Sequence, residues 1–215
     1  MFRYALATTL AAALNASVAG AQPGFVPASY TSGGLPAAPL LAVSGGEVFL
    51  EVLVADDGHV DSIRTLRTTP PFTEAVTGVV RNWRFKPAVE AARPVASSVF
   101  VAAMFAPPAL NVPTLGRPPQ DVASPSAETP GTIVANPASY PLRAVGDGTV
   151  LVEVSIDAGG MTTDAHVIAP APGFDAAAVA AARSWLFVGA RRGGSGVPAR
   201  AYLIFNFRAP VTGLP

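Results

Sequence analysis

The alternation of hydrophobic and other residues predicts a β-hairpin in the first half of the chain. Residues 47–55 place aliphatic side chains at every second position, as a strand with one buried face does. Asp56-Asp57-Gly58 follows, and its glycine can adopt the positive φ that a tight turn needs. Residues 59–66 then read as the second strand of the hairpin.

A helix and one more strand follow this hairpin. Apolar residues recur at helical spacing from Phe72 to Trp83, which predicts a helix with one buried stripe. Residues 95–105 alternate again and predict the last strand. The unit is therefore α+β, a β-β-α-β module with a three-stranded antiparallel sheet and one helix on one face.

The second half of the chain repeats this unit. The shift that aligns Gly46 with Gly148 also aligns Phe72 with Phe174 and the two tryptophans, Trp83 and Trp185, with each other. Since so many rare residue types keep one register, we interpret the chain as a tandem duplication. We expect both tryptophans in the core, because each falls on the buried stripe of its helix.

The remaining segments predict export and flexible connections. Residues 1–21 contain Arg3, a short apolar run and an Ala-Gly-Ala site, which together predict a signal peptide that is cleaved before Gln22. An uncleaved inner-membrane anchor is the alternative. Proline-rich chain favours an extended spacer. The predicted domains are a signal peptide (1–21), a flexible N-terminus (22–34), a first module (35–106), a proline-rich linker (107–137) and a second module (138–210).

Composition excludes several classes of function. The formal net charge of the 215 residues is zero, so nothing favours nucleic acid or anionic lipid as a partner. The chain has no cysteine, and His59 and His166 lack zinc-site spacing, so we expect no metal and no cofactor. Glu51 and Glu153 fall on the face of their strands opposite the core, where exposure to solvent is enough to account for a charged side chain. We therefore predict a protein that is not an enzyme.

The ordered motifs of the two copies resemble one known family. Trp83-Arg84-Phe85-Lys86-Pro87 ends the first helix, and the second copy opens with Tyr140-Pro141 followed by Gly148-Thr149-Val150. This set resembles the C-terminal domain of TonB. The resemblance implies a periplasmic, non-enzymatic binding protein in TonB-dependent transport. Its partner would be an extended segment of an outer-membrane receptor or another envelope protein, captured by β-strand addition.

A three-stranded sheet leaves two open edges, and we predict the last strand of each module as the free one. Pro94 and Pro198 lie just before these strands, where they do not interrupt pairing. The outer strand of the hairpin remains the alternative edge. The apolar outward side chains also fit packing of sheet on sheet, as in a structural module that pairs with its own second copy or with a second chain, including a homodimer. The candidate peptide-binding residues are Ser98, Phe100, Ala102, Met104, Arg200, Tyr202, Ile204, Asn206 and Arg208.

Overall fold

Both halves of the chain fold as the repeat predicts, and they share one sheet. The computed structural model describes residues 24–40, 42, 44–107 and 123–209. The first half contains β1 (Ser29–Ser32), β2 (Gly46–Val54), β3 (Val60–Arg67), α1 (Phe72–Val80), β4 (Arg84–Lys86), β5 (Ala88–Glu90), β6 (Arg93–Val95) and β7 (Ser97–Phe105). The second half contains β8 (Gly131–Val134), β9 (Gly148–Ile156), β10 (Thr162–Ala169), α2 (Asp175–Arg183), β11 (Leu186–Val188), β12 (Ala190–Arg192), β13 (Ser195–Val197) and β14 (Ala199–Phe207).

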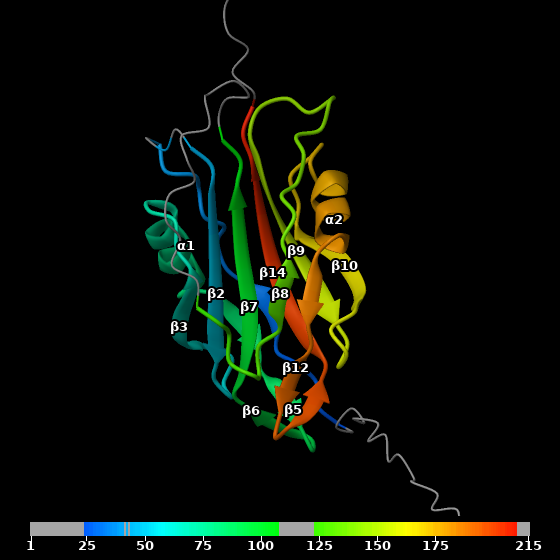
Figure 1. The fold of residues 1–215 in the computed structure, drawn as a ribbon. Coiled ribbons are helices and arrows are strands. Elements are labelled where there is room, and N and C mark those ends of the chain that lie inside the picture. Colours follow the sequence, from blue (N-terminus) through cyan, green and yellow to red (C-terminus); the bar gives the residue numbers. More distant parts are fainter. Residues whose placement is uncertain (1–23, 41, 43, 108–122, 210–215) are drawn as a thin grey trace, which may run out of the picture.

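The long strands form a six-stranded sheet in the order β10-β9-β14-β7-β2-β3 (Figure 1). Within each half the three strands are antiparallel, so the predicted α+β fold with a β-β-α-β module is confirmed. At the centre, β7 and β14 run parallel, with Phe100 beside Ala201 and Phe105 beside Asn206. The last strands of the two copies thus join the halves along a parallel seam.

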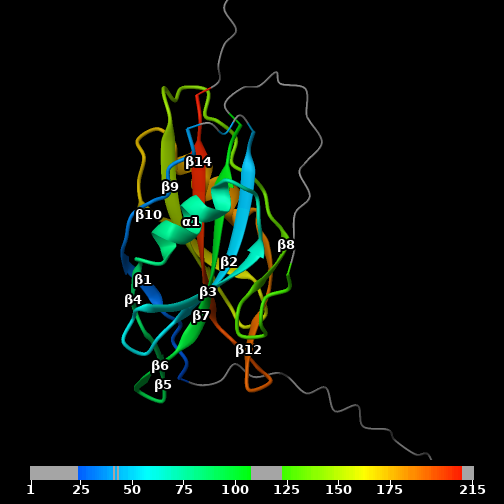
Figure 2. The same cartoon turned by 90° about the vertical axis from the view of Figure 1, so that its left-hand side faces the viewer.

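The helices lie against opposite faces of this sheet (Figures 1 and 2). Phe72 of α1 packs 4.6 Å from Phe105, and Phe174 at the start of α2 packs 4.8 Å from Phe207, between ring centroids. Phe105 lies beside Asn206 in the seam, so Phe207, one residue further along, points to the other face. The two halves are therefore related by an approximate two-fold rotation about an axis that runs along the seam.

Two extended segments that precede the copies are ordered, which differs from the sequence prediction. We call residues 24–34 the first arm and residues 123–136 the second arm. β1 in the first arm pairs with β4, and β8 in the second arm pairs with β11. Residues of each arm also contact the other half. The described part of the predicted flexible N-terminus and residues 123–136 of the predicted linker are therefore packed against the rest of the protein. Residues 108–122 of the predicted linker and residues 1–23 lie outside the described residues.

Small residues and side-chain contacts position each helix on its sheet. A Cβ atom at Gly46 would lie 2.3 Å from the Phe72 ring, and one at Gly148 would lie 2.4 Å from the Phe174 ring. Glycine is required at both places because each ring lies directly on the start of a strand. At the first turn of α1, the Thr69 N–H donates to Thr73 Oγ1 (2.9 Å), which ties the helix to the preceding turn.

Candidate functional site

The strands predicted to be free edges are the two central strands of the sheet. β7 pairs with β2 on one side and β14 on the other, and β14 pairs with β9 and β7. The backbone groups of both strands are therefore used within the chain, and the prediction of a free edge there is wrong. Each last strand satisfies its open edge with the equivalent strand of the other copy. This applies to Phe100, Ala102, Met104, Tyr202, Ile204 and Asn206. Ser98 and Arg200 pair within their own halves, with Leu53 and Ser155, and Arg208 follows β14 and donates to the Ala42 carbonyl (2.8 Å).

Side chains predicted to point outward from the last strands are buried under the opposite half. Phe100 packs against Trp185 and Phe187, whose ring centroids lie 6.5 Å and 6.4 Å away. Tyr202 packs in the same way against Trp83 (6.2 Å) and Phe85 (5.7 Å). Each half therefore completes the core of the other, which explains the apolar character of these positions.

Glu153 is buried beneath the first arm, although the sequence places it on a solvated face. The Tyr202 hydroxyl donates to Glu153 Oε2 (2.9 Å), and Arg200 Nε lies 3.1 Å from Oε1. The first arm closes over this group: the Tyr30 N–H donates to the Tyr202 hydroxyl oxygen, and Arg200 donates to the Pro27 carbonyl. Burial, together with the adjacent Glu153 carboxylate, raises the pKa of Tyr202 well above its ordinary value, so this hydroxyl stays protonated as a donor.

Glu51 occupies the equivalent position in the first half and lies beneath the second arm. Its carboxylate accepts hydrogen bonds from the Ser126 hydroxyl and N–H, from Thr129 Oγ1 (2.6 Å) and from Arg64 Nε (2.6 Å). Burial acts to raise the pKa of Glu51, but these hydrogen bonds outweigh it and hold the pKa below the ordinary 4.5. Glu51 therefore fastens the second arm to the sheet directly, whereas Glu153 holds Tyr202 and Arg200, which bind the first arm.

Glu51 should make the stability of the protein sensitive to acid. Because its folded-state pKa is lowered, its contribution is complete above about pH 4.5, the ordinary value, and is lost as pH falls through the folded-state pKa. Thermal melts of the parent and of Glu51→Gln should therefore differ most near neutral pH and converge in acid. A difference in melting temperature that stays constant with pH would show that Glu51 does not act through its charge.

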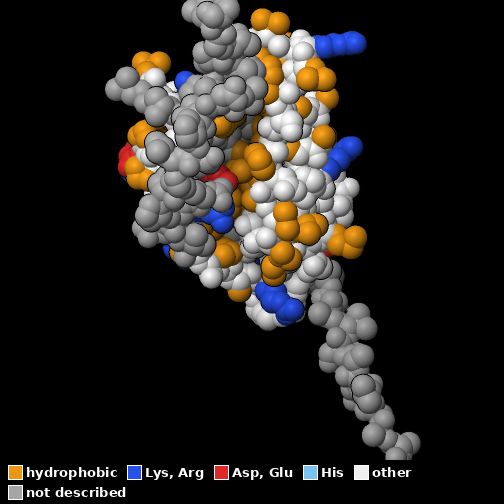
Figure 3. All heavy atoms as spheres, turned by 45° about the horizontal axis from the view of Figure 1, so that its top comes forward, with side chains coloured by type: hydrophobic (Ala, Val, Ile, Leu, Met, Phe, Trp, Pro, Cys, Tyr) orange, Lys and Arg blue, Asp and Glu red, His pale blue; other side chains and the backbone are white. Residues whose placement is uncertain are grey.

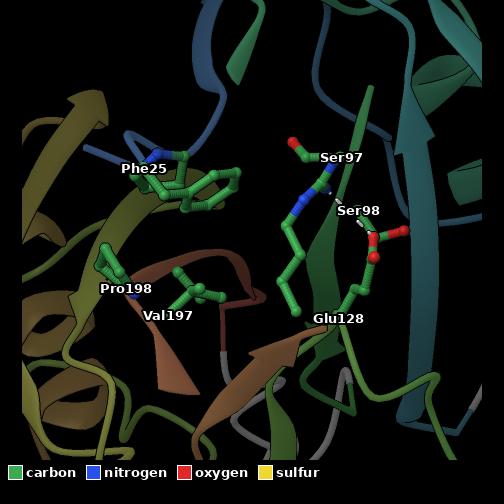
Figure 4. Close-up of a pocket in the computed structure, with 9 residues that line it drawn as sticks. Phe25, Ser97, Ser98, Glu128, Val197 and Pro198 are labelled. Carbon is green, nitrogen blue, oxygen red and sulfur yellow. Dashed lines mark hydrogen bonds and ion pairs between the residues drawn. The ribbon is translucent and has the colours of Figure 1, made fainter. Parts of the chain in front are cut away.

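Residues of both halves meet around a small cavity at the start of β7 and β14 (Figure 4). Arg192 Nε lies 3.3 Å from Glu90, and its Nη1 lies 3.4 Å from Glu128 and donates to the Ala96 carbonyl (3.1 Å). The cavity beside it, lined by Phe25 and Ser97 among others, has a volume of about 10 Å³. That is no more than one water molecule needs, so this place is a contact between halves and not a ligand site.

The outer edges of the sheet are β3 and β10, the outer strands of the two hairpins. The second arm begins against β3: the Ala123 N–H donates to the Leu66 carbonyl (2.7 Å), and Arg64 donates to the Ser124 carbonyl (2.9 Å). Among the described residues, no backbone hydrogen bond reaches the outer side of β10 from outside the sheet. β10 is therefore the more open of the two edges.

The histidines and charged side chains of the described residues do not form a metal site, and they do not form a charged patch on the face in Figure 3. Within the described ranges, no cluster of His, Asp and Glu has the composition of a metal site. His59 and His166 are about half exposed and pair with Asp57 and Asp164. On the face in Figure 3, charged side chains are scattered singly and do not gather in a patch of one sign. Neither described helix is long and apolar enough to cross a membrane.

The buried carboxylates and the ordered arms are features that sequence reasoning missed. Self-comparison offered one signal: the shift that aligns Gly46 with Gly148 also aligns β1 with β8. The residues at these positions differ in type, so only their equal distance from each module marks them as part of the repeat. The outer strand of the hairpin, kept as the alternative edge, is where the structure leaves backbone groups open.

Comparison with protein families matches residues 41–107 and 137–209 to the family described as Gram-negative bacterial TonB protein C-terminal. The two matches coincide with the two β-β-α-β units, and each ends just after the last strand of its unit. No curated protein matches the chain. Because the matched segments span more than half of the residues, the chain belongs to the family of Gram-negative bacterial TonB protein C-terminal domains, of which it carries two tandem copies.

Proposed function

We propose that this protein is a non-enzymatic binding protein of the periplasm, in which β10 captures an extended segment of a partner by β-strand addition. The observation that carries the proposal is the open edge of β10, eight residues long, in a sheet whose other strands are paired or contacted by an arm. An added strand gains main-chain hydrogen bonds along such an edge. Membership of the TonB C-terminal family supports an outer-membrane receptor, or another envelope protein, as that partner in TonB-dependent transport.

The charged side chains of β10 suit an edge strand that must not pair with the same edge of another molecule before it binds its partner. Asp164 and His166 form an exposed pair, with His166 Nδ1 2.9 Å from the Asp164 carboxylate. The hydrogen bond from His166 lowers the pKa of Asp164, which keeps a negative charge on the strand. Charged residues on an edge strand hinder pairing between identical edges, yet they leave the backbone available to a complementary segment.

A periplasmic location rests on residues 1–21, which we propose are a signal peptide removed before Gln22. The net charge near zero and the low charge content of the chain agree with a protein partner more than with nucleic acid or lipid.

A structural role is the second candidate, and the parallel seam favours it. The two copies already use their last strands to pair with each other, as a self-contained building block would. In that role neither edge binds a receptor segment. The same experiment separates the two functions.

A proline placed on β10 should abolish partner binding without unfolding the protein, but only at every second position of the strand. Backbone N–H groups of an edge strand point alternately to the sheet and to solvent. Of His166→Pro and Val167→Pro, one should therefore break the ladder with β9, while the other folds like the parent and loses only the outward donor. A photo-crosslinking residue at Thr163, used in cells, should yield an adduct with an envelope protein that the second variant no longer forms.

The matched controls are Arg64→Pro and Thr65→Pro, the equivalent positions on β3. The variant of this pair that folds should keep the adduct from Thr163. If no envelope protein is crosslinked at β10, or if the adduct survives in the folded proline variant, strand addition at this edge is excluded and the structural role is favoured.

A further inference from the structure

A groove whose floor is formed by the first half lies between the second arm and the sheet, on the face that carries α2, and residues of β11 and β12 complete its lining. It has a volume of about 440 Å³, within the roughly 300–1,000 Å³ of small-molecule sites. Its floor includes Phe49, Leu66 and Phe100, and residues of the second arm form one wall. Val188 of β11, which is 55% exposed, lies on the rim.

Two arginines and no acidic residue line this groove. The Arg67 guanidinium lies 4.3 Å from the centre of the Phe49 ring and is held by Glu47. Its Nε is buried and has no hydrogen-bond partner among the described residues, so Glu47 balances the positive charge of Arg67 through Nη1 alone. Arg191 contributes a second positive charge and donates to the Gly194 carbonyl.

The corresponding place in the other half is built differently, although the two halves share one fold. The counterpart of Thr132 is Tyr30, whose ring packs 5.1 Å from Trp83 and 6.2 Å from Tyr202. The short Thr132 leaves that space to the groove. Arg67 and Arg191 correspond to Ala169 and Val89. The fold itself therefore does not require the groove or its charges.

We propose that this groove binds a small amphipathic anion, an apolar body that carries one carboxylate. The apolar body would lie on Phe49, Leu66 and Phe100, since burial of its surface is favourable. The carboxylate would pair with the guanidinium groups of Arg67, whose side chain is 23% exposed, and Arg191. Glu47 orients Arg67 without lining the groove. This site is separate from the β10 edge and does not depend on it.

Calorimetric titration of the full-length protein with decanoate, decanol and acetate tests the proposal. We expect saturable binding of one decanoate. Decanol, which has the same chain without the charge, should bind at least about tenfold more weakly, because charge-assisted hydrogen bonds are lost. Acetate, which lacks the apolar body, should not bind measurably. Equal affinities for decanoate and decanol, or no binding of decanoate, would overturn the proposal.

Two variants locate the site, and a third is the control. Thr132→Tyr gives the second arm the residue of the first arm and should fill the groove, so decanoate binding should fall by at least tenfold. Arg67→Gln should lower the affinity for decanoate toward that for decanol, with Arg191 keeping part of the difference. Arg84→Gln removes an exposed positive charge from β4, the counterpart of β11. Arg84 does not line the groove, so this variant should bind decanoate like the parent. Parent-like binding in both Thr132→Tyr and Arg67→Gln would exclude this groove.

Discussion

Neither half of the chain should fold when it is separated from the other. A first half on its own leaves one edge of β7 unpaired and exposes Phe100, which lies under Trp185 in the whole protein. It also removes Tyr202 from its contact with Trp83. A small domain has only about 5–15 kcal/mol of stability, so the loss of a shared core and of one side of a central strand exceeds its reserve.

A protease site inserted within residues 108–122 allows this to be measured without changing either arm. The cleaved protein should keep the circular dichroism of the parent and elute as one species. After separation in denaturant, each fragment should lack cooperative unfolding, and mixing the fragments should restore it. Cooperative unfolding of either fragment alone would instead support the separable modules predicted from the sequence.

Replacement of either tryptophan by alanine should destabilise the whole protein, not one half of it. Trp83 is fully buried, contacts Tyr30 and Tyr202, and donates from Nε1 to the Gly34 carbonyl (2.8 Å). Trp185 is equally buried and donates to the Asn136 carbonyl (2.8 Å). Loss of such a side chain leaves a cavity and costs about 3–5 kcal/mol. Trp83→Ala and Trp185→Ala should each lower the urea midpoint in one cooperative transition.

Leu186→Ala provides the matched control, because Leu186 follows Trp185 directly but is 54% exposed. Its free energy of unfolding should stay within about 0.5 kcal/mol of the parent. Two separate transitions in a tryptophan variant would show that the halves unfold independently. A tryptophan variant as stable as the parent would contradict the burial on which the joint core depends.

The parallel seam changes how the duplication is understood. A single β-β-α-β module leaves its last strand open, and the second copy in this chain closes that edge. The arms then cross to the opposite half, where Glu51 holds the second arm directly and Tyr202 and Arg200, both in contact with Glu153, hold the first. Strand addition by a partner is consequently restricted to the outer strands, and the second arm leaves β10 as the more open one.

The sequence by itself determined the content of each module. Alternation located the hairpin and the last strand, and helical spacing located α1. The repeat transferred these assignments to the second half, and no element end differs by more than three residues. Both tryptophans are buried as predicted. These features are readable because the period of side chains along a strand or helix is a local property of the chain.

Only the tertiary structure decided which strand pairs with which, and what covers the second face of the sheet. Alternation shows that Phe100 and Met104 share a face, but not that Trp185 and Phe187 of the other copy lie on it. Strand pairing uses backbone groups that are the same in almost every residue, so an open edge and a paired edge look alike in sequence. Glu51 is buried by Ser126 and Thr129, which lie far away along the chain, and no local pattern records such a contact.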